Sequence, residues 1–366
     1  MKMYKVFIIV LALAVSVKAH AQSIFNDLLS STAKVMFIDS VVVDKNDFLH
    51  TIQLNSESGS ILSYEDFFHK QAQIPCAVYL NEFNNRCFYA YGDTLTGTSL
   101  YSMDKIGGSW SEPKPLKEFG ETFPDQNYPF LMTDGITLYF AAKGEHSLGG
   151  YDIFMTLFDS ESGDFYKPEN IGLPYNSTAN DYLIAFNEVD TLGWLVSDRY
   201  QPAGKVCIYT FVPTFPRIGF QGENLSAGEL KRIAELRSIK DTWGFGNREA
   251  AMKRLQAMRS NLERTQKKNA SHFVINDRRV IYQPDDLLSP TAKKFYTQYL
   301  EVSEMLHKNK ERIKQLREEY HKASADRRQK MSASILKLEK DIALQQKDCN
   351  SLIKKVRQAE NSIIRK

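Results

Sequence analysis

The sequence has few cysteines and almost no net charge, and both shortages limit what the protein can be. Four cysteines among 366 residues exclude a disulfide-dense scaffold. A formal charge of +3, from 47 basic and 44 acidic residues, gives no sign of a dedicated nucleic-acid binder. Hydrophobic residues make up 43% of the chain, which is enough for a soluble core and excludes wholesale disorder.

The common catalytic and metal-binding motifs are also missing. The chain contains no HExxH, GxSxG, P-loop or EF-hand pattern. The seven histidines never form a close ligand pair, and His146 lies in a glycine-rich stretch, where a solvated side chain is expected. The sequence therefore offers no catalytic residue, metal ligand or cofactor site, and we expect a protein that is not an enzyme.

The first 21 residues have the features of a signal peptide. Two lysines flank the start of an apolar run at positions 6–17, and Ala19-His20-Ala21 forms a small-x-small cleavage site. The run is shorter than the ~20 apolar residues that span a bilayer. The mature chain is expected to begin at Gln22, which is not the cysteine of a lipoprotein. The sequence thus predicts an exported protein.

The composition of the remaining chain changes near residue 224. Sixteen of the 19 glycines and ten of the 12 prolines come before this point. Residues 22–224 hold 33 aromatics and a net charge of −14, from 12 basic and 26 acidic residues. Residues 225–366 hold eight aromatics and a net charge of +14, from 32 basic and 18 acidic residues. Such opposite charges favour docking between the halves or head-to-tail assembly, which salt would screen.

Residues 22–224 are predicted to be mainly β. Short β-branched and aromatic runs alternate with Gly, Asn, Asp and Pro, and they lie at 35–38, 41–43, 77–80, 88–91, 137–140 and 194–196. Thr133-Asp134-Gly135 predicts a tight hairpin turn, because Asp-Gly readily takes positive φ angles.

These runs repeat with a period of about 50 residues, near the size of one four-stranded propeller blade. Residues 86–90, 137–141 and 192–196 correspond to one another. Each is followed by a second apolar strand, at 99–101, 152–154 and 207–209. Residues 22–73 form a preceding β segment, in which 34–66 could supply another, irregular blade.

Two strings between these units carry a family resemblance. They are Gly149-Gly150-Tyr151-Asp152-Ile153-Phe154 and Asn170-Ile171-Gly172-Leu173-Pro174-Tyr175-Asn176-Ser177. Across about residues 74–213 (domain 74–224), the chain resembles the WD40-like PD40 β-propeller repeats of TolB-type proteins and of Bacteroidetes-type envelope proteins. Only three units are recognised, whereas closed propellers usually have four to eight blades. No OmpA-like domain is recognised after them, so its peptidoglycan-binding role is not carried over.

Residues 225–284 are predicted to form a helical connector. Ser226 and Glu229 make a capping box at the start of a helix that runs to about Trp243. A second helix is expected at 248–268, and a small hairpin is expected within residues 273–282. One face of the second helix is apolar and consists of Ala251, Leu255, Met258 and Leu262.

Residues 285–366 have the pattern of a coiled coil, opened by Ser289-Pro290. One seam comprises Phe295, Tyr299, Val302, Leu306, Asn309, Ile313, Leu316, Tyr320 and Ala323. A second comprises Met331, Ile335, Leu338, Ile342, Gln345, Cys349, Leu352, Val356, Ala359 and Ile363. The seams differ in phase by one residue across 324–330. Because no Gly or Pro lies there, one helix about 110 Å long is favoured, with a helical hairpin as the alternative.

Several aspartates and cysteines have structural interpretations. Asp104, Asp134, Asp152 and Asp181 are expected to hold backbone amides at blade turns. Residues 102–110 resemble a sialidase Asp-box with one extra residue, which is a structural turn in that family. Cys76 and Cys87 could form a disulfide, but a turn near Asn84 would place Cys87 opposite Leu80 instead. Cys349 is expected as a small buried seam residue.

These patterns predict a non-catalytic cell-envelope protein, with a propeller-like module for protein–protein binding or scaffolding and a coiled coil for oligomerisation or docking. The resemblance implies the periplasm or outer membrane, in a secretion or surface-assembly complex of the type IX kind. Expected partners are envelope proteins, further copies of the chain, and glycan or lipid headgroups, but not nucleic acid. Alternatives are a carbohydrate-active hydrolase with paired carboxylates, or a glycan- or peptidoglycan-binding protein.

Overall fold

The computed structural model divides the chain into two compact units, Met1–Leu262 and Glu263–Lys366. The first is β-rich and built from antiparallel sheets, and the second is largely helical. The residues described are 23–116, 119, 122–144, 146–270, 273–276, 279–281 and 284–364. The predicted signal peptide lies outside them. Among these residues, no helix combines the length and the hydropathy needed to cross a membrane.

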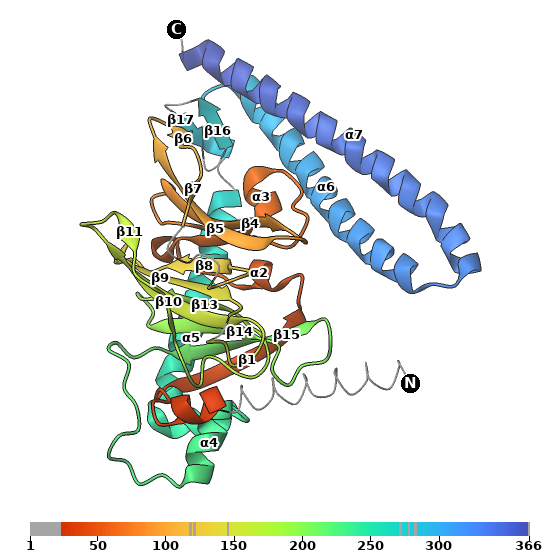
Figure 1. Cartoon of the computed structure of the whole chain (residues 1–366). Coiled ribbons are helices and arrows are strands. Elements are labelled where there is room, and N and C mark those ends of the chain that lie inside the picture. Colours follow the sequence, from red (N-terminus) through yellow and green to blue (C-terminus); the bar gives the residue numbers. More distant parts are fainter. Residues whose placement is uncertain are drawn as a thin grey trace. The chain divides into compact units, whose positions relative to one another are not determined.

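Three sheets follow one another along the β-rich unit, from the orange strands to the green strands of Figure 1. The first comprises β2(Ser60–Ser63), β3(Ala77–Leu80), β4(Arg86–Asp93), β5(Gly97–Ile106), β6(Ser109–Trp110) and β7(Lys114–Pro115). The second comprises β8(Asn127–Leu131), β9(Thr137–Ala142), β10(Asp152–Asp159), β11(Asp164–Phe165) and β12(Glu169–Asn170). The third comprises β13(Asp181–Asn187), β14(Leu192–Ser197), β15(Lys205–Val212) and β1(Met36–Asp44).

The predicted repeat is confirmed at the level of strands. The runs at 86–90, 137–141 and 192–196 lie in β4, β9 and β14. Each of these strands pairs antiparallel with the predicted apolar strand that follows it: β4 with β5, β9 with β10 and β14 with β15. The Asp-Gly turn joins β8 to β9 as expected, with Gly135 at a φ of 69°. Local sequence therefore identified one pair of adjacent strands in every sheet.

The strands of residues 34–66 join two existing sheets. β1 pairs with β15 from Met36 opposite Val212 to Asp44 opposite Lys205, and so becomes the outer strand of the third sheet. β2 pairs with β3 at the edge of the first sheet. These residues therefore form no separate blade, and the described strands form no closed barrel or propeller ring.

Three short helical segments lie between β1 and β3, two before β2 and one after it. They are α2(Phe48–Thr51), the 3₁₀ helix η1(Ser56–Ser58) and α3(Tyr64–Phe68). The core lies between the sheets, where β3, β8 and β13 are buried along their whole lengths. Aromatic rings connect neighbouring sheets: the ring centroids of Tyr79 and Phe130 are 5.2 Å apart, and those of Phe130 and Phe186 are 6.0 Å apart.

The helix predicted to reach Trp243 is shorter than expected. α4(Ala227–Glu235) begins with the predicted Ser226–Glu229 capping box, but it ends where Leu236 adopts a left-handed φ of 50°. A 3₁₀ helix, η3(Ile239–Phe245), follows. There Trp243 donates a hydrogen bond from Nε1 to the Phe37 carbonyl oxygen over 3.0 Å, so contact with β1 replaces helix continuation.

α5(Arg248–Ala270) covers the third sheet with its predicted apolar face. Ala251, Leu255 and Met258 are buried, and Leu262 is half-buried against the same core. Residues 225–262 thus fold with the β-rich part, although the composition changes at residue 224. Their basic side chains contact this sheet, as in the ion pair of 3.6 Å between Arg259 and Asp39.

The helical unit contains the predicted small hairpin and two long helices. Its elements are β16(Phe273–Asn276), β17(Arg279–Ile281), the 3₁₀ helix η4(Pro284–Asp286), α6(Pro290–Lys322) and α7(Ala325–Ile364). β16 and β17 pair antiparallel, which confirms the hairpin. Ser289 caps α6 by accepting a hydrogen bond from the Ala292 amide, and Pro290 is its first residue, as predicted.

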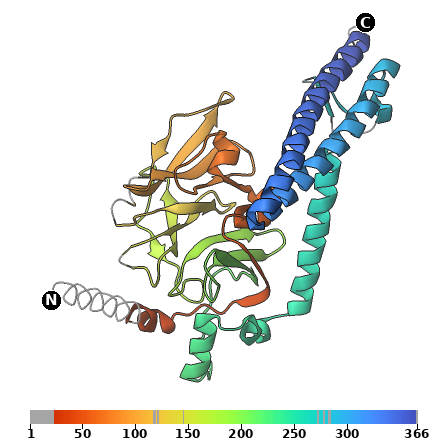
Figure 2. The ribbon, with the colours of Figure 1, turned by 90° about the vertical axis from the view of Figure 1, so that its right-hand side faces the viewer.

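The preference for one continuous helix was wrong, and the helical hairpin is confirmed. α6 ends at Lys322, Ala323 is extended with a ψ of 153°, and α7 runs back along α6 (Figure 2). Asn309 and Gln345 share a hydrogen bond of 3.1 Å across the two helices. The phase change in the heptads lies close to the point where the chain reverses direction. The extended connection at Ala323 makes this reversal without Gly or Pro. A single long coiled-coil helix is absent from the described residues.

The cysteines and three of the four singled-out aspartates have the expected roles. All four cysteines are free and buried, and Cys87 lies opposite Leu80, as predicted. Asp134, Asp152 and Asp181 accept hydrogen bonds from backbone amides. For Asp104 the expectation was wrong, because its carboxylate instead pairs with Arg86 over 2.7 Å on the neighbouring strand.

Candidate binding pocket

The two motif strings form a buried hydrogen-bond network that joins the second and third sheets. Asp152 accepts bonds from the amides of Leu148 and Gly149 over 2.8 and 3.2 Å. Asn176 contacts the backbone of Ile153 twice, accepting from its N–H over 2.7 Å and donating to its carbonyl over 2.9 Å. Since these side chains satisfy buried backbone groups, the motif has a structural role here.

A buried ion pair completes this network. Arg199 and Asp181 are almost fully buried, and their charged atoms lie 2.5 Å apart. Arg199 also donates a hydrogen bond to the Pro174 carbonyl oxygen over 2.8 Å. Burial, reinforced by the charge of Asp181, raises the pKa of Asp152 to about 7. These side chains are engaged with one another and with the backbone, which supports a structural role for the network.

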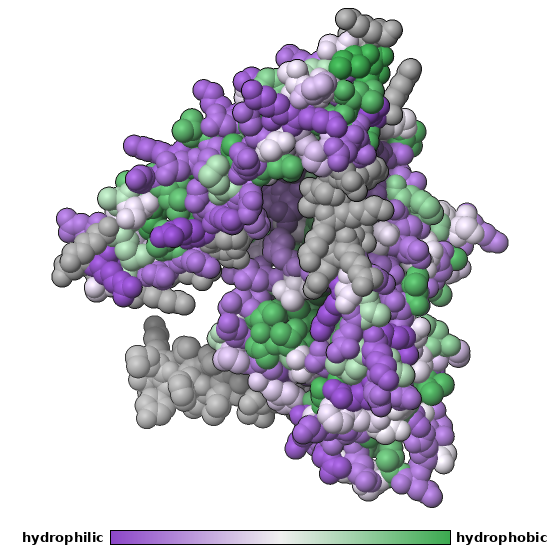
Figure 3. Space-filling model, turned by 180° about the vertical axis from the view of Figure 1, so that it is seen from behind, coloured by the Kyte–Doolittle hydropathy of each residue, from purple (hydrophilic) through white to green (hydrophobic). Residues whose placement is uncertain are grey.

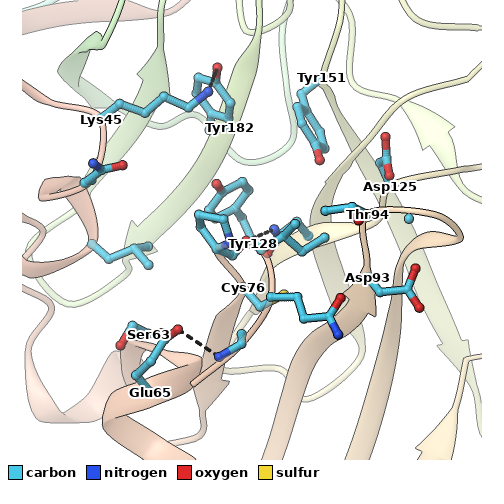
Figure 4. A pocket seen from close by; sticks show the side chains of 18 of the residues that line it. Lys45, Ser63, Glu65, Cys76, Asp93, Thr94, Asp125, Tyr128, Tyr151 and Tyr182 are labelled. Atoms are coloured by element: carbon cyan, nitrogen blue, oxygen red, sulfur yellow. Dashed lines mark hydrogen bonds between the residues drawn. The ribbon is translucent and has the colours of Figure 1, made fainter. Parts of the chain in front are cut away.

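All three sheets contribute to an open pocket of about 940 Å³ (Figure 4). Its walls come from the segment after β1, the loop between α3 and β3, the β4–β5 turn, the segment entering β8, the β9–β10 connection and the start of β13. Leu95 at the β4–β5 turn is 94% exposed at its rim. A concave pocket lined by aromatic side chains and a few polar groups is a common place for a ligand or partner segment to bind.

Four aromatic side chains form the pocket's inner wall. The Tyr128 ring centroid lies 5.4 Å from that of Phe48 and 5.8 Å from that of Tyr182. Tyr151 is 5.8 Å from Tyr182 and is the least buried of the four. Burial raises the pKa of each tyrosine above its usual value, which keeps the hydroxyls protonated near neutral pH.

Irregular pairing at the strand entrances aims two of these tyrosines. The β8–β9 register shifts between Asn127 and Phe130, and Tyr128 within this bulge has a φ of 53°. The β13–β14 register shifts in the same way around Tyr182. Bulges bend a strand and redirect a side chain, and a positive φ at a bulky residue costs free energy. The two sheets thus present equivalent tyrosines to one cavity.

Two lysines lie over the aromatic wall. The Lys45 ammonium is 4.5 Å from the Tyr182 ring centroid and donates a 2.7 Å hydrogen bond to its Oη. Tyr182 in turn donates to Asp198 over 2.8 Å. Lys143 lies 4.9 Å from the Tyr151 ring centroid and 2.6 Å from Asp125. Such cation–π contacts orient the ammonium groups at the pocket surface.

The pocket's carboxylates already have partners. Asp93 accepts bonds from the amides of its own turn, which lower its pKa, and Asp125 pairs with Lys143. Glu65 accepts a 3.1 Å bond from the Ala72 amide. Burial raises the pKa of the Cys76 thiol to about 12, so it is not a nucleophile near neutral pH. Within the described pocket, these groups favour binding over acid–base chemistry.

The sequence patterns did not single out this pocket. His146, weighed earlier, is exposed and lies outside it, and only Tyr151 belongs to a quoted motif. A usable signal was present, because an Asx-Tyr pair begins the first strand of two successive repeats, at Asn127-Tyr128 and Asp181-Tyr182. The register shifts at these positions turn both tyrosines into the pocket, and the sequence pattern does not predict those shifts.

Comparison with known proteins adds no evidence about the function of this pocket. No family model, curated protein or solved structure matches the chain. The resemblance to PD40 repeats therefore stays a prediction.

Proposed function

We propose that this protein is a non-catalytic binding and scaffolding protein of the cell envelope. Its β-rich unit is a propeller-like module that holds a segment of a partner protein in the pocket. Its helical hairpin is a docking or self-association element. The envelope location rests on the signal-like residues 1–21 and on the PD40 resemblance. A secretion or surface-assembly complex is the corresponding setting.

One observation carries the binding role: the three sheets meet around one open cavity whose wall combines tyrosines with two lysines. Aromatic rings supply large contact area at little cost in conformational entropy, and lysines add charge recognition. Elsewhere, on the face that Figure 3 shows, hydrophilic residues dominate and apolar residues form separate patches.

The order of strands supports the propeller-like description. In each sheet three consecutive strands form a meander that starts from a buried strand: β3-β4-β5, β8-β9-β10 and β13-β14-β15. β1 supplies the fourth strand of the last sheet. We assign three blades to the module, fewer than in closed propellers.

Site-specific photocrosslinking tests the pocket. A photoreactive phenylalanine analogue at Leu95, which lines the pocket, should capture a discrete envelope partner in cells. The same analogue at Val189, 63% exposed on the β13–β14 turn and absent from the pocket lining, is the matched control. Adding Tyr151→Ala and Lys45→Ala should weaken the Leu95 adduct. Equal adducts from both positions, insensitive to these substitutions, would refute the pocket as the binding site.

Glycan binding is a second candidate, favoured by aromatic rings of the first sheet that pack against α3. Tyr91 is 49% exposed and stacks on Tyr64 with 5.4 Å between ring centroids. Trp110 packs edge-on against Phe67 at 5.6 Å. The exposed ring of Tyr91 offers a flat apolar face on which a sugar ring could stack. Affinity electrophoresis in gels containing envelope polysaccharide would detect this, and Tyr91→Ala should abolish any retardation.

A further inference from the structure

The side of α7 turned away from α6 carries a regular line of lysines. Lys340, Lys347 and Lys354 are seven residues apart and therefore share one side of the helix. The seam residues Ile342 and Cys349 lie on the opposite side, where Cys349 is buried against α6. The three lysines are exposed, and among the described residues no carboxylate lies within ion-pair distance of them.

Two leucines share this side. Leu336 is 57% exposed and Leu344 is 60% exposed. Together with the three lysines they define the lysine face, which extends for about 27 Å from Leu336 to Lys354 at 1.5 Å per residue. Exposed apolar and cationic side chains therefore share this side of α7.

The acidic residues of this part of α7 lie outside the lysine face. Glu339 bonds Arg317 of α6 over 2.9 Å. Asp341 and Asp348 lie about a quarter turn or more from the centre of the face, at 100° per residue. The surrounding helical unit, residues 263–366, carries 24 basic and 14 acidic residues. The lysine face therefore carries positive charge, and the helical unit to which it belongs has a positive net charge as well.

We propose that the lysine face binds an anionic lipid surface. Lysines near headgroup phosphates each contribute electrostatic attraction, and exposed leucines can enter the boundary between headgroups and acyl chains. A nucleic-acid backbone would satisfy the lysines but would leave both leucines in water. A straight helix face also matches a planar surface along its length. This inference does not depend on the proposed role of the pocket.

Vesicle co-sedimentation tests the proposal, using protein without the predicted signal, residues 1–21. Vesicles of phosphatidylcholine with added phosphatidylglycerol should bind the protein at least about tenfold more strongly than phosphatidylcholine alone. Raising NaCl from about 0.05 M to about 0.5 M should abolish the difference. Lys340→Glu, Lys347→Glu and Lys354→Glu together should lower binding at least about tenfold. Leu336→Ser with Leu344→Ser should lower it severalfold at unchanged charge.

A second triple variant provides a matched control. Lys231→Glu, Lys253→Glu and Lys308→Glu change the net charge equally, but each of these lysines already pairs with a carboxylate four residues away. This variant should retain most of the binding, with both triple variants checked by circular dichroism. Equal losses in the two triple variants would overturn the proposal. So would binding to a DNA duplex that matches vesicle binding in strength and ignores the leucine substitutions.

Discussion

Tyr128 and Tyr182 owe their place in the pocket to backbone irregularity at single residues. Each follows an Asx residue at the entrance of a buried strand, and each lies where the strand register shifts. A regular strand would alternate its side chains between the two faces of the sheet. The bulges turn these rings toward the same cavity instead, so the site depends on local departures from ideal pairing.

Arg199 and Arg86 offer a direct comparison of buried and exposed ion pairs. Each pairs with an aspartate 18 residues away in the sequence, but only the Arg199–Asp181 pair is buried. Arg199→Met should lower the free energy of unfolding by about 3–5 kcal/mol, because it leaves Asp181 charged and unpaired in the core. Arg86→Met should cost about 1 kcal/mol or less. Urea unfolding measures both, and similar losses would contradict the expectation.

Asp152 should make stability depend on pH. Its pKa is about 7 in the folded protein, whereas an aspartate in the unfolded chain keeps the ordinary value of 3.8. Between these values the folded state binds more protons, so the free energy of unfolding falls as pH rises from about 4 to about 7. The full change is on the order of 4 kcal/mol. Urea midpoints across this range should fall less steeply for Asp152→Asn, and an unchanged slope would assign the effect to another group.

At the scale of elements, the helical hairpin shows what a heptad pattern leaves open. The pattern correctly marked the seam, since Leu306, Ile313, Cys349 and Val356 are buried. It did not decide whether the seam residues face another chain or the same chain folded back. That choice depends on Ala323, whose extended conformation reverses the direction of the helices.

The hydrogen bond between Asn309 and Gln345 in this seam should contribute to the free energy of unfolding of the helical hairpin. Asn309→Leu or Gln345→Leu alone leaves one half-buried amide unpaired and should cost about 1 kcal/mol. Both substitutions together should stabilise the hairpin by about 1–2 kcal/mol, because a polar seam residue costs stability. Asn350→Leu, on the exposed side of α7, is the control. Helical circular dichroism during urea unfolding measures each change, and single variants as stable as the parent would rule out the bond.

At the scale of the whole molecule, the unit boundary differs from the boundary in composition. Basic residues 225–262 belong with the acidic β-rich part, because α5 buries Ala251, Leu255 and Met258 against it. Charge alone marked residue 224 as the division. The boundary of the folded unit lies at residue 262 instead, because apolar burial contributes more to stability than exposed charge pairs do.

Two fragments should separate these boundaries. Residues 22–262 should unfold cooperatively as a soluble protein, because they contain the complete first unit. Residues 22–224 lack α5 and would expose the apolar surface that it covers, so they should aggregate or lose several kcal/mol of stability. Scanning calorimetry and gel filtration provide the measurements. Equal stability of the two fragments would show that α5 is dispensable for the β-rich unit.

Local sequence determined the elements and many contacts between neighbours. It identified the strand repeats, the Asp-Gly turn, Cys87 opposite Leu80, the Ser226 and Ser289 caps and the seam of the long helices. All of these depend on residues close in the chain or on a simple period. Tertiary structure alone decided that β1 joins β15, that α6 and α7 form a hairpin, and that three tyrosines share one pocket. Those outcomes depend on contacts between distant segments, whose free energies no local pattern specifies.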